Sequence, residues 1–349
     1  MNAKRVINDK NMKYKSINSK RILLLAPAFF GYEKRIQKKM EEMGAIVDLY
    51  DERSVTSELD KAFLKVNPNF FAGKTEAYYN SIIDKHRDVQ YDFIFIVKCE
   101  MITEPILKKL RTTYPNAVFC LYLWDSVKNI KGITAKFKYF DRILSFDSCD
   151  VKEYPIMKFR PLYYADEFKK ELKKADIYKY DISFCGTIHS DRYSIIKEVL
   201  KYCNKYKLTY KTFCYLQSNF IYYFHRITKP EFCSTSISDF SFEKKSGSDI
   251  ATIVDESKVI LDIQHPNQTG LTQRTIEMIG MNKKLITTNV DIMNYDFYNP
   301  NNILVIPRKG FIIPIEFFKS KYEPLSDEIY KKYSIESWIN DILYEIEEV

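Results

Sequence analysis

Residues 259–289, VILDIQHPNQTGLTQRTIEMIGMNKKLITTN, contain the pattern that decides the fold. The continuous apolar run Val259–Ile263 predicts a strand buried on both faces, and Leu271–Met281 has helical apolar spacing. The short run Lys284–Thr287 predicts a second strand. A strand, a polar loop with Gly270, a helix and another strand form a βαβ unit, and such a unit indicates a parallel sheet.

The same alternation of strand and helix extends along the chain in two series. The expected strands are Arg21–Ala26, Ala45–Tyr50, Phe93–Val97, Val118–Leu123 and Arg142–Phe146 in the first series, and Ile182–Cys185, Lys207–Tyr215, Val259–Ile263, Lys284–Thr287 and Ile303–Ile306 in the second. The other expected helices are Lys34–Met43, Glu104–Thr113, Tyr193–Tyr206 and Ile335–Glu347. The sequence therefore predicts an α/β fold with two Rossmann-like domains, each built on a parallel sheet.

A chain of 349 residues exceeds what one hydrophobic core usually holds, which also favours two domains. The expected parts are a basic flexible tail at 1–19, an N-terminal domain at 20–155, a linker at 156–178, a C-terminal domain at 179–334 and a final helix at 335–349. We expect that last helix to pack back on the first domain. Residues 216–247 are aromatic and irregular, and they predict no defined element.

Composition narrows the class of protein. No apolar run approaches the roughly 20 residues of a membrane span, and the N-terminus lacks the apolar core of a signal peptide. The seven cysteines include no Cys-x-x-Cys pair, so we expect reduced thiols and a cytoplasmic protein. Seven Lys/Arg against one Asp in Lys4–Arg21 contribute to the net charge of +8, and this tail suggests peripheral contact with the inner face of the membrane. No nucleic-acid-binding motif accompanies the charge, so we expect no nucleic-acid partner.

The candidate ligand site lies at the ends of predicted strands. Gly31, Gly186 and Gly270 each follow one, and open α/β sheets bind ligands at the carboxyl ends of their strands. The helix after Gly270 presents free N–H groups suited to a diphosphate, and Thr272 adds a hydroxyl. Glu277 is expected on the helix face that points away from the sheet, where its carboxylate can accept from a ribose diol. The alternatives are ordinary turn glycines and an exposed helix glutamate.

GLTQRTIEMIGMNKKLITTN resembles the donor-binding segment of GT-B glycosyltransferases, and more narrowly the CgeB-like enzymes of bacterial polysaccharide and lipopolysaccharide assembly. DISFCGTIHSDR (181–192), LWDS (123–126) and FDRILSFDSCD (140–150) are similar to other segments of the same group. The resemblance implies that Glu277 binds the nucleotide ribose. It implies that the preceding loop binds the diphosphate and sugar. The expected contacts with the nucleotide-sugar are Gly186, His189, Arg192, His265, Gly270, Leu271, Thr272, Arg274 and Glu277.

The implied reaction moves a sugar from a nucleotide-sugar to a saccharide or lipid-linked saccharide. No Asp-x-Asp occurs, so we expect no metal and no cofactor besides the donor, with basic groups and a helix dipole neutralising the leaving diphosphate. A base is needed if the anomeric centre is inverted, and Asp125, Glu33 and Asp147 each follow a predicted strand. Asp125 is preferred. The alternative function is a non-catalytic protein of the same fold that binds a nucleotide or nucleotide-sugar.

Overall fold

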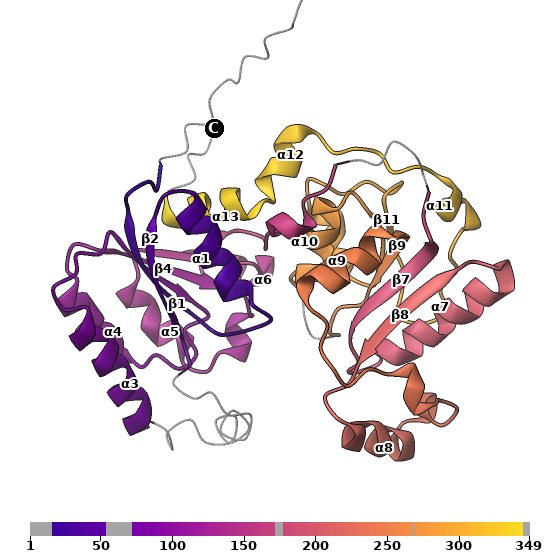
Figure 1. The fold of residues 1–349 in the computed structure, drawn as a ribbon, viewed down its shortest axis with the longest axis horizontal. Helices are drawn as coiled ribbons and strands as arrows, with labels where there is room; N and C mark the ends of the chain where they lie inside the picture. The colour runs from indigo at the N-terminus through magenta and orange to yellow at the C-terminus, as the bar shows by residue number, and fades with distance from the viewer. Residues whose placement is uncertain (1–15, 54–71, 172–176, 267–268, 345–349) are drawn as a thin grey trace, which may run out of the picture.

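A computed structural model describes residues 16–53, 72–171, 177–266 and 269–344 (Figure 1). Within these residues the chain forms two α/β domains, each around one parallel sheet of six or five strands. Most of the basic tail predicted at residues 1–19 lies outside the described residues. No described helix combines the length and apolar character that a membrane span requires.

The first sheet has the strand order β2-β1-β3-β4-β5-β6, with every pair parallel. Its strands are β1 (Arg21–Ala26), β2 (Ile46–Asp51), β3 (Phe93–Val97), β4 (Val118–Leu123), β5 (Arg142–Ser145) and β6 (Lys158–Phe159). The helices along this part of the chain are α1 (Tyr32–Glu42), α3 (Ala72–Lys85), α4 (Glu104–Thr113), α5 (Ile133–Lys136) and α6 (Ser148–Glu153). The five strands predicted in this part are confirmed. β6 lies in the segment that we expected to be a linker.

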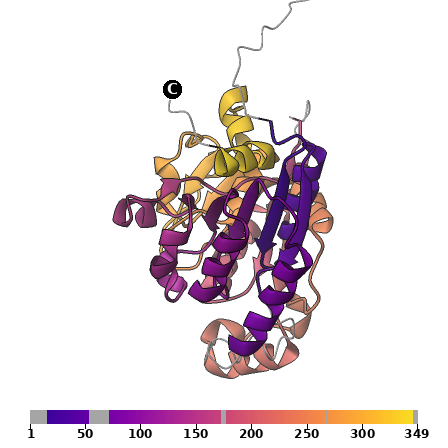
Figure 2. The ribbon, with the colours of Figure 1, turned by 90° about the vertical axis from the view of Figure 1, so that its left-hand side faces the viewer.

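Both faces of the first sheet are covered, which explains its continuous apolar strands. Leu23 and Leu25 of β1 belong to the cluster that contains residues of α3 and α4, and Figure 2 shows these purple helices in front of the sheet. Ile22 and Leu24 belong to the opposite cluster, which contains residues of α1. Because successive side chains of a strand point to opposite faces, a doubly covered strand has to be apolar at every position.

The second sheet has the order β11-β10-β9-β7-β8, again entirely parallel. Its strands are β7 (Tyr180–Thr187), β8 (Tyr210–Tyr215), β9 (Ser257–Asp262), β10 (Lys284–Thr287) and β11 (Ile303–Val305). The helices along this part of the chain are α7 (Arg192–Tyr206), α8 (Asn219–Thr228), α9 (Gly247–Asp255), α10 (Gln273–Gly280), α11 (Ile315–Lys319) and α12 (Asp327–Lys332). All five predicted strands are present. β8 begins later than expected because Lys207 ends α7 in a left-handed conformation with φ 54°.

The last described helix, α13 (Ile335–Leu343), returns to the first domain as expected (Figure 1). The buried Trp338 ring lies 4.8 Å from the Tyr122 ring of β4 and 5.7 Å from the Phe95 ring of β3, measured between centroids. The helix thus completes the apolar layer beside α1. The chain crosses between the two domains twice, and this holds their facing edges together.

Candidate functional site

The helix expected to bind the nucleotide, α10, lies at the junction of the two domains. Tyr32, the first residue of α1, donates its hydroxyl hydrogen to Glu277 Oε1 at 2.6 Å. Arg274 Nη1 lies 2.7 Å from the other carboxylate oxygen, Oε2. Glu277 is fully buried, and this burial raises the pKa of its carboxyl above the ordinary value. The alternative of a solvent-exposed helix glutamate is therefore wrong for this position.

We expected the face of α10 that carries Glu277 to point away from the sheet and into an open site, but α10 is buried on this outer side as well. Gly280, on the expected outer side, packs against residues 164–168: an added Cβ would lie 2.5 Å from the Tyr164 ring and 2.7 Å from the Phe168 carbonyl oxygen. Gln273 Nε2 donates to the Tyr163 carbonyl oxygen. The periodicity alone could not reveal this second contact, because the covering residues come from the segment between the domains.

The loop before α10 touches the first domain directly. An added Cβ at Gly270 would lie 2.4 Å from the Phe146 ring, so only glycine fits between this loop and the end of β5. Thr269 Oγ1 lies 2.9 Å from both carboxylate oxygens of Asp147 and donates to them. The missing side chain at Gly270 thus lets this loop lie directly against the first domain. Contact of Gly270 with a ligand stays a prediction.

The start of α10 is held by a buried carboxylate that the sequence analysis did not select. Thr272 is the N-cap: its Oγ1 accepts from the Thr275 backbone N–H at 3.1 Å and donates to Asp262 Oδ2 at 2.9 Å. Thr275 Oγ1 donates to the same oxygen at 2.6 Å. Leu271 is buried beside this cap. Asp262 ends β9, so a search for polar residues at strand ends would have found it.

Basic and histidine side chains meet at the carboxyl ends of β7 and β9. Arg192 donates through Nη1 to the Thr187 carbonyl oxygen at 2.7 Å and through Nη2 to the Ile263 carbonyl oxygen. The His189 and His265 rings lie 5.4 Å apart between centroids. Burial, followed by the charge of Arg192, lowers the pKa of His189 to about 4, so this imidazole is neutral at pH 7. Arg192 thus ties the two strand ends together beside the paired histidines.

Arg308 belongs to the same cluster and was missed. It follows β11, forms an ion pair with Asp191, and donates to the Gln264 carbonyl oxygen at 3.2 Å. Its position after a strand is the signal that could have found it. Gly186, near the end of β7, lies beside the Phe184 and Arg192 side chains: an added Cβ would lie 3.1 Å from the Phe184 ring and 3.4 Å from Arg192 Nη1.

The three candidate bases of the first domain have different surroundings. Asp125 follows β4 with 36% of its side chain exposed; Oδ1 accepts from the Asn129 side-chain amide at 2.8 Å, and Oδ2 lies 3.5 Å from Lys98 Nζ. Glu33 is buried and accepts from the Phe29 N–H at 3.1 Å. Asp147 is buried, caps α6 and is occupied by Thr269. Asp125 is therefore the most accessible of the three.

An aromatic group lies at the same edge as Asp125. Phe29 and Phe30 are 51% and 49% exposed, and their rings meet edge to face at 4.6 Å between centroids. The Phe29 ring lies 6.3 Å from that of Trp124. From the second domain, Lys244 Nζ lies 5.2 Å from the Phe30 ring centroid. Exposed rings beside a half-buried carboxylate offer a surface on which the apolar face of a sugar can stack.

A buried acid lies below this edge. Glu52 follows β2, has no exposed surface, and accepts from the Met101 N–H. Burial raises the pKa of its carboxyl to about 7. Between β3 and Met101, Lys98 and Cys99 have positive φ angles of 73° and 59°, which side-chain-bearing residues rarely adopt. This turn after β3 brings the Met101 N–H to the Glu52 carboxylate.

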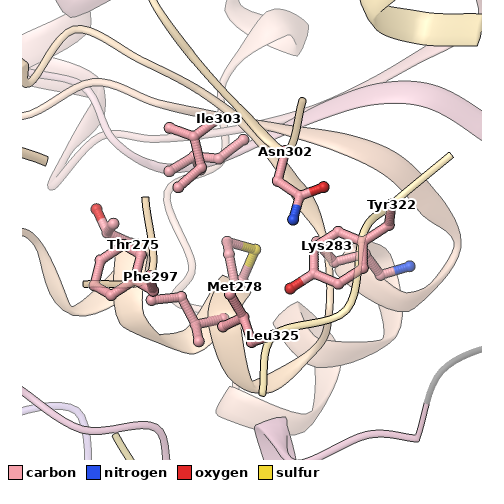
Figure 3. Close-up of a pocket in the computed structure, with 10 residues that line it drawn as sticks. Thr275, Met278, Lys283, Phe297, Asn302, Ile303, Tyr322 and Leu325 are labelled. Carbon is pink, nitrogen blue, oxygen red and sulfur yellow. The ribbon is translucent and has the colours of Figure 1, made fainter. Parts of the chain in front are cut away.

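A separate hollow lies inside the second domain, on the Thr275–Ile279 side of α10 (Figure 3). It is lined by Thr275, Met278, Ile279, Lys283, Leu285, Phe297, Asn302, Ile303, Tyr322 and Leu325. Three of its polar groups have partners in the chain: Lys283 Nζ donates to the Asp255 carbonyl oxygen, the Asn302 amide donates to the Glu323 carbonyl oxygen, and Thr275 Oγ1 donates to Asp262. We therefore interpret it as an imperfection in the packing of α10.

The two parallel-sheet domains, joined at their carboxyl edges and closed by α13, define the GT-B fold. Solved structures of this fold resemble the chain over most of its length. No protein-family model matches the sequence, and no curated protein matches it.

Three of the similar structures show the extent of the likeness. HepE from Anabaena in complex with UDP-glucose has a TM-score of 0.58 and 10% identity, covering 92% of this chain and 98% of its own. A glycosyltransferase from Rickettsia africae has a TM-score of 0.52 and 15% identity, with 93% of each chain covered. Sucrose-phosphate synthase from Thermosynechococcus elongatus has a TM-score of 0.54 and 10% identity, covering 93% of this chain and 94% of its own. At these identities the likeness establishes the fold.

Proposed function

We propose that this chain is a glycosyltransferase that transfers a sugar from a nucleotide-sugar to a saccharide or lipid-linked saccharide. The observation that carries the proposal is the position of Glu277, on a helix that begins just after Gly270 at the junction of the two GT-B domains. The similarity to HepE, whose structure contains UDP-glucose, supports a nucleotide-sugar as donor. The narrower resemblance to CgeB-like enzymes adds a proposed role in bacterial surface polysaccharide assembly.

In this proposal the second domain holds the donor. Glu277 accepts from the ribose hydroxyls, after Tyr32 releases the oxygen that it occupies. The diphosphate lies near Gly270 and the basic group of Arg192 and Arg308, where positive charge stabilises the leaving group. His189, whose imidazole is neutral at pH 7, and His265 supply hydrogen bonds to the phosphates or the sugar. The transfer proceeds without a metal ion, which stays a prediction of the sequence.

The first domain supplies the acceptor side and the base. Asp125 takes the proton of the acceptor hydroxyl as that oxygen attacks the anomeric carbon and the bond to the diphosphate breaks. Its exposure favours it over Glu33 and Asp147, whose carboxylates are buried and serve the backbone or Thr269. The Phe29, Phe30 and Trp124 rings receive the acceptor sugar.

The deciding experiment has two steps. A thermal-shift screen against nucleotide diphosphates and nucleotide-sugars selects the donor, because a ligand of the folded state raises the melting temperature. The selected nucleotide-sugar is then incubated with saccharide and lipid-linked acceptors, and the product is identified by mass spectrometry. Binding followed by transfer supports the proposal. Binding without transfer or hydrolysis supports the non-catalytic alternative, and the absence of any nucleotide binding contradicts both.

A further inference from the structure

Helix α8 has an exposed apolar face that no described segment covers. Phe220 and Ile227 are 77% and 86% exposed, and Tyr223 and Phe224 are 54% and 55% exposed. Spacings of three and four residues put these four side chains, the apolar face of α8, on one side of the helix. Figure 1 shows α8 at the end of the second domain opposite to α12 and α13.

The other side of α8 holds the helix in place. Tyr222 is buried and donates its hydroxyl hydrogen to the Thr235 carbonyl oxygen at 3.0 Å. The His225 ring lies 4.9 Å from the Phe232 ring between centroids. Because these contacts fasten the helix, its apolar face is not needed for local packing. Contiguous exposed apolar surface of this kind marks a contact with something outside the chain.

Charge and size indicate what that contact is. Between Leu216 and Pro230 the chain has no Asp or Glu but has Arg226 and Lys229, and the whole protein carries a net charge of +8. A ten-residue helix is about 15 Å long, and four such side chains expose on the order of 500 Å². A stable dimer needs roughly 800 Å² per partner. The face is thus small for a protein interface, and its aromatic and basic composition suits an anionic bilayer surface.

We propose that α8 lies in the plane of an anionic phospholipid surface, with its apolar face in the boundary between headgroups and acyl chains. Arg226 flanks this face and contacts lipid phosphates. The proposal goes beyond the transfer reaction and uses none of the residues assigned to donor or base. It also differs from the basic tail as an anchor, because the contact is made by the exposed side chains of a helix in the second domain.

Sedimentation of the full-length protein with vesicles tests the proposal. The vesicles contain phosphatidylcholine alone or phosphatidylcholine with phosphatidylglycerol. We expect the intact protein to bind the anionic vesicles, and Phe220→Ser/Ile227→Ser to lower the partition coefficient by about tenfold. Ile312→Ser is the matched control, because Ile312 is 85% exposed and lies outside α8. It should leave binding unchanged.

Two results would overturn the proposal. In the first, the double variant sediments with anionic vesicles as well as the intact protein, which would leave the tail as the anchor. In the second, the intact protein does not bind vesicles but dimerises in analytical ultracentrifugation, and the double variant is monomeric. Circular dichroism checks the fold of each variant. If the double variant does not fold, Ile227→Ser alone replaces it, because that side chain is the more exposed of the two.

Discussion

The two sheet edges that meet at the domain junction both bury carboxylates, Glu33 and Asp147 on the first, but they differ in what they leave accessible. On the first domain, Asp125 and the Phe29 and Phe30 rings remain accessible to solvent. On the second, Glu277 is fully buried and Asp262 nearly so, each with partners from the chain. The second edge is thus organised before a ligand arrives, whereas the first keeps an open surface. This division suits a fixed donor site facing a more permissive acceptor site.

The largest expected effect tests Asp125, the accessible carboxylate at the sheet edge of the first domain. Asp125→Asn keeps the shape of the side chain and removes its basicity, so turnover should fall by about 10²–10⁴-fold while nucleotide affinity stays the same. Steady-state kinetics and calorimetry with the donor measure the two quantities. Asp84→Asn, an exposed position on α3, is the control.

A fall of less than about tenfold would make Asp125 structural, and Glu33 and Asp147 would be examined next. NMR of the product should precede these measurements. Retention of the anomeric configuration would remove the need for a base of this kind in the first domain.

The second prediction concerns Glu52, the buried acid that follows β2 in the first domain. The pKa of Glu52 is about 7 in the folded state against an ordinary 4.5, so its neutral form is favoured by folding. Below pH 4.5 the acid costs no stability; as pH rises from 4.5 to 7 the unfolded state ionises first, and on the order of 3 kcal/mol of stability is lost. Glu52→Gln should remove this loss, as measured by urea unfolding across the pH range.

His189, at the sheet edge of the second domain, has a pKa that is lowered where that of Glu52 is raised. Its folded pKa of about 4 lies below the ordinary 6.5, so its contribution is present above pH 6.5 and is lost as pH falls towards 4. In His189→Asn, the free energy of unfolding should fall less between pH 6.5 and pH 4. The loss of stability that Glu52 causes at higher pH should be unchanged. A Glu52→Gln protein whose stability follows the same pH curve as the parent would contradict the assignment.

The third prediction tests Glu277, the buried carboxylate of α10 in the second domain. Glu277→Gln should weaken binding of the nucleotide diphosphate by about 1–3 kcal/mol, because a charged acceptor for the ribose hydroxyls is lost. Calorimetry measures the affinity, and Glu256→Gln at the half-buried C-cap of α9 is the control. Glutamine is preferable to alanine, because it keeps the size of the side chain and an oxygen acceptor beside Arg274. Either change removes the negative charge that pairs with Arg274, at up to about 3–5 kcal/mol, so the free energy of unfolding of the variant is measured as well. A folded Glu277→Gln protein with unchanged affinity would remove Glu277 from the site.

The smallest expected effect tests the hydrogen bond from Tyr32 of the first domain to Glu277 of the second. Tyr32→Phe deletes the hydroxyl that occupies Glu277 Oε1, so the unliganded protein should lose about 1 kcal/mol of stability. Since the ribose no longer competes with Tyr32, nucleotide affinity should rise by up to about tenfold. Calorimetry beside Tyr206→Phe, at an exposed position, gives the comparison. Weaker binding would mean that Tyr32 itself contacts the nucleotide.

Most of the fold could be predicted from local patterns, and the exceptions have physical reasons. Doubly covered strands such as β1 and β3 are apolar at every position, so they are visible in the sequence. β6 is only two residues long and was hidden in a segment without period. Residues 216–247 escaped prediction because α8 is apolar on the side that faces away from the domain, contrary to the usual pattern.

The candidate site was predictable in part for the same reason. Gly270 and Arg192 could be selected because each follows a predicted strand. Position along a βαβ unit determines which edge of the sheet such a residue reaches. Tyr32 and Arg308 were missed because their importance comes from residues distant in the chain, Glu277 and Asp191. Their roles in binding and transfer stay predictions until the variants are measured.

The sequence by itself determined most strands of the two parallel sheets and the helices α1, α4, α7, α10 and α13, because strand and helix periods and apolar coverage are local properties of the chain. Only the tertiary structure decided which polar groups are buried. Glu277, Asp147 and Asp125 have the same chemistry in the sequence, but the packing of one domain on the other covers the first two and leaves the third accessible. Burial depends on contacts across hundreds of residues, and these contacts determine the pKa and the availability of each carboxylate.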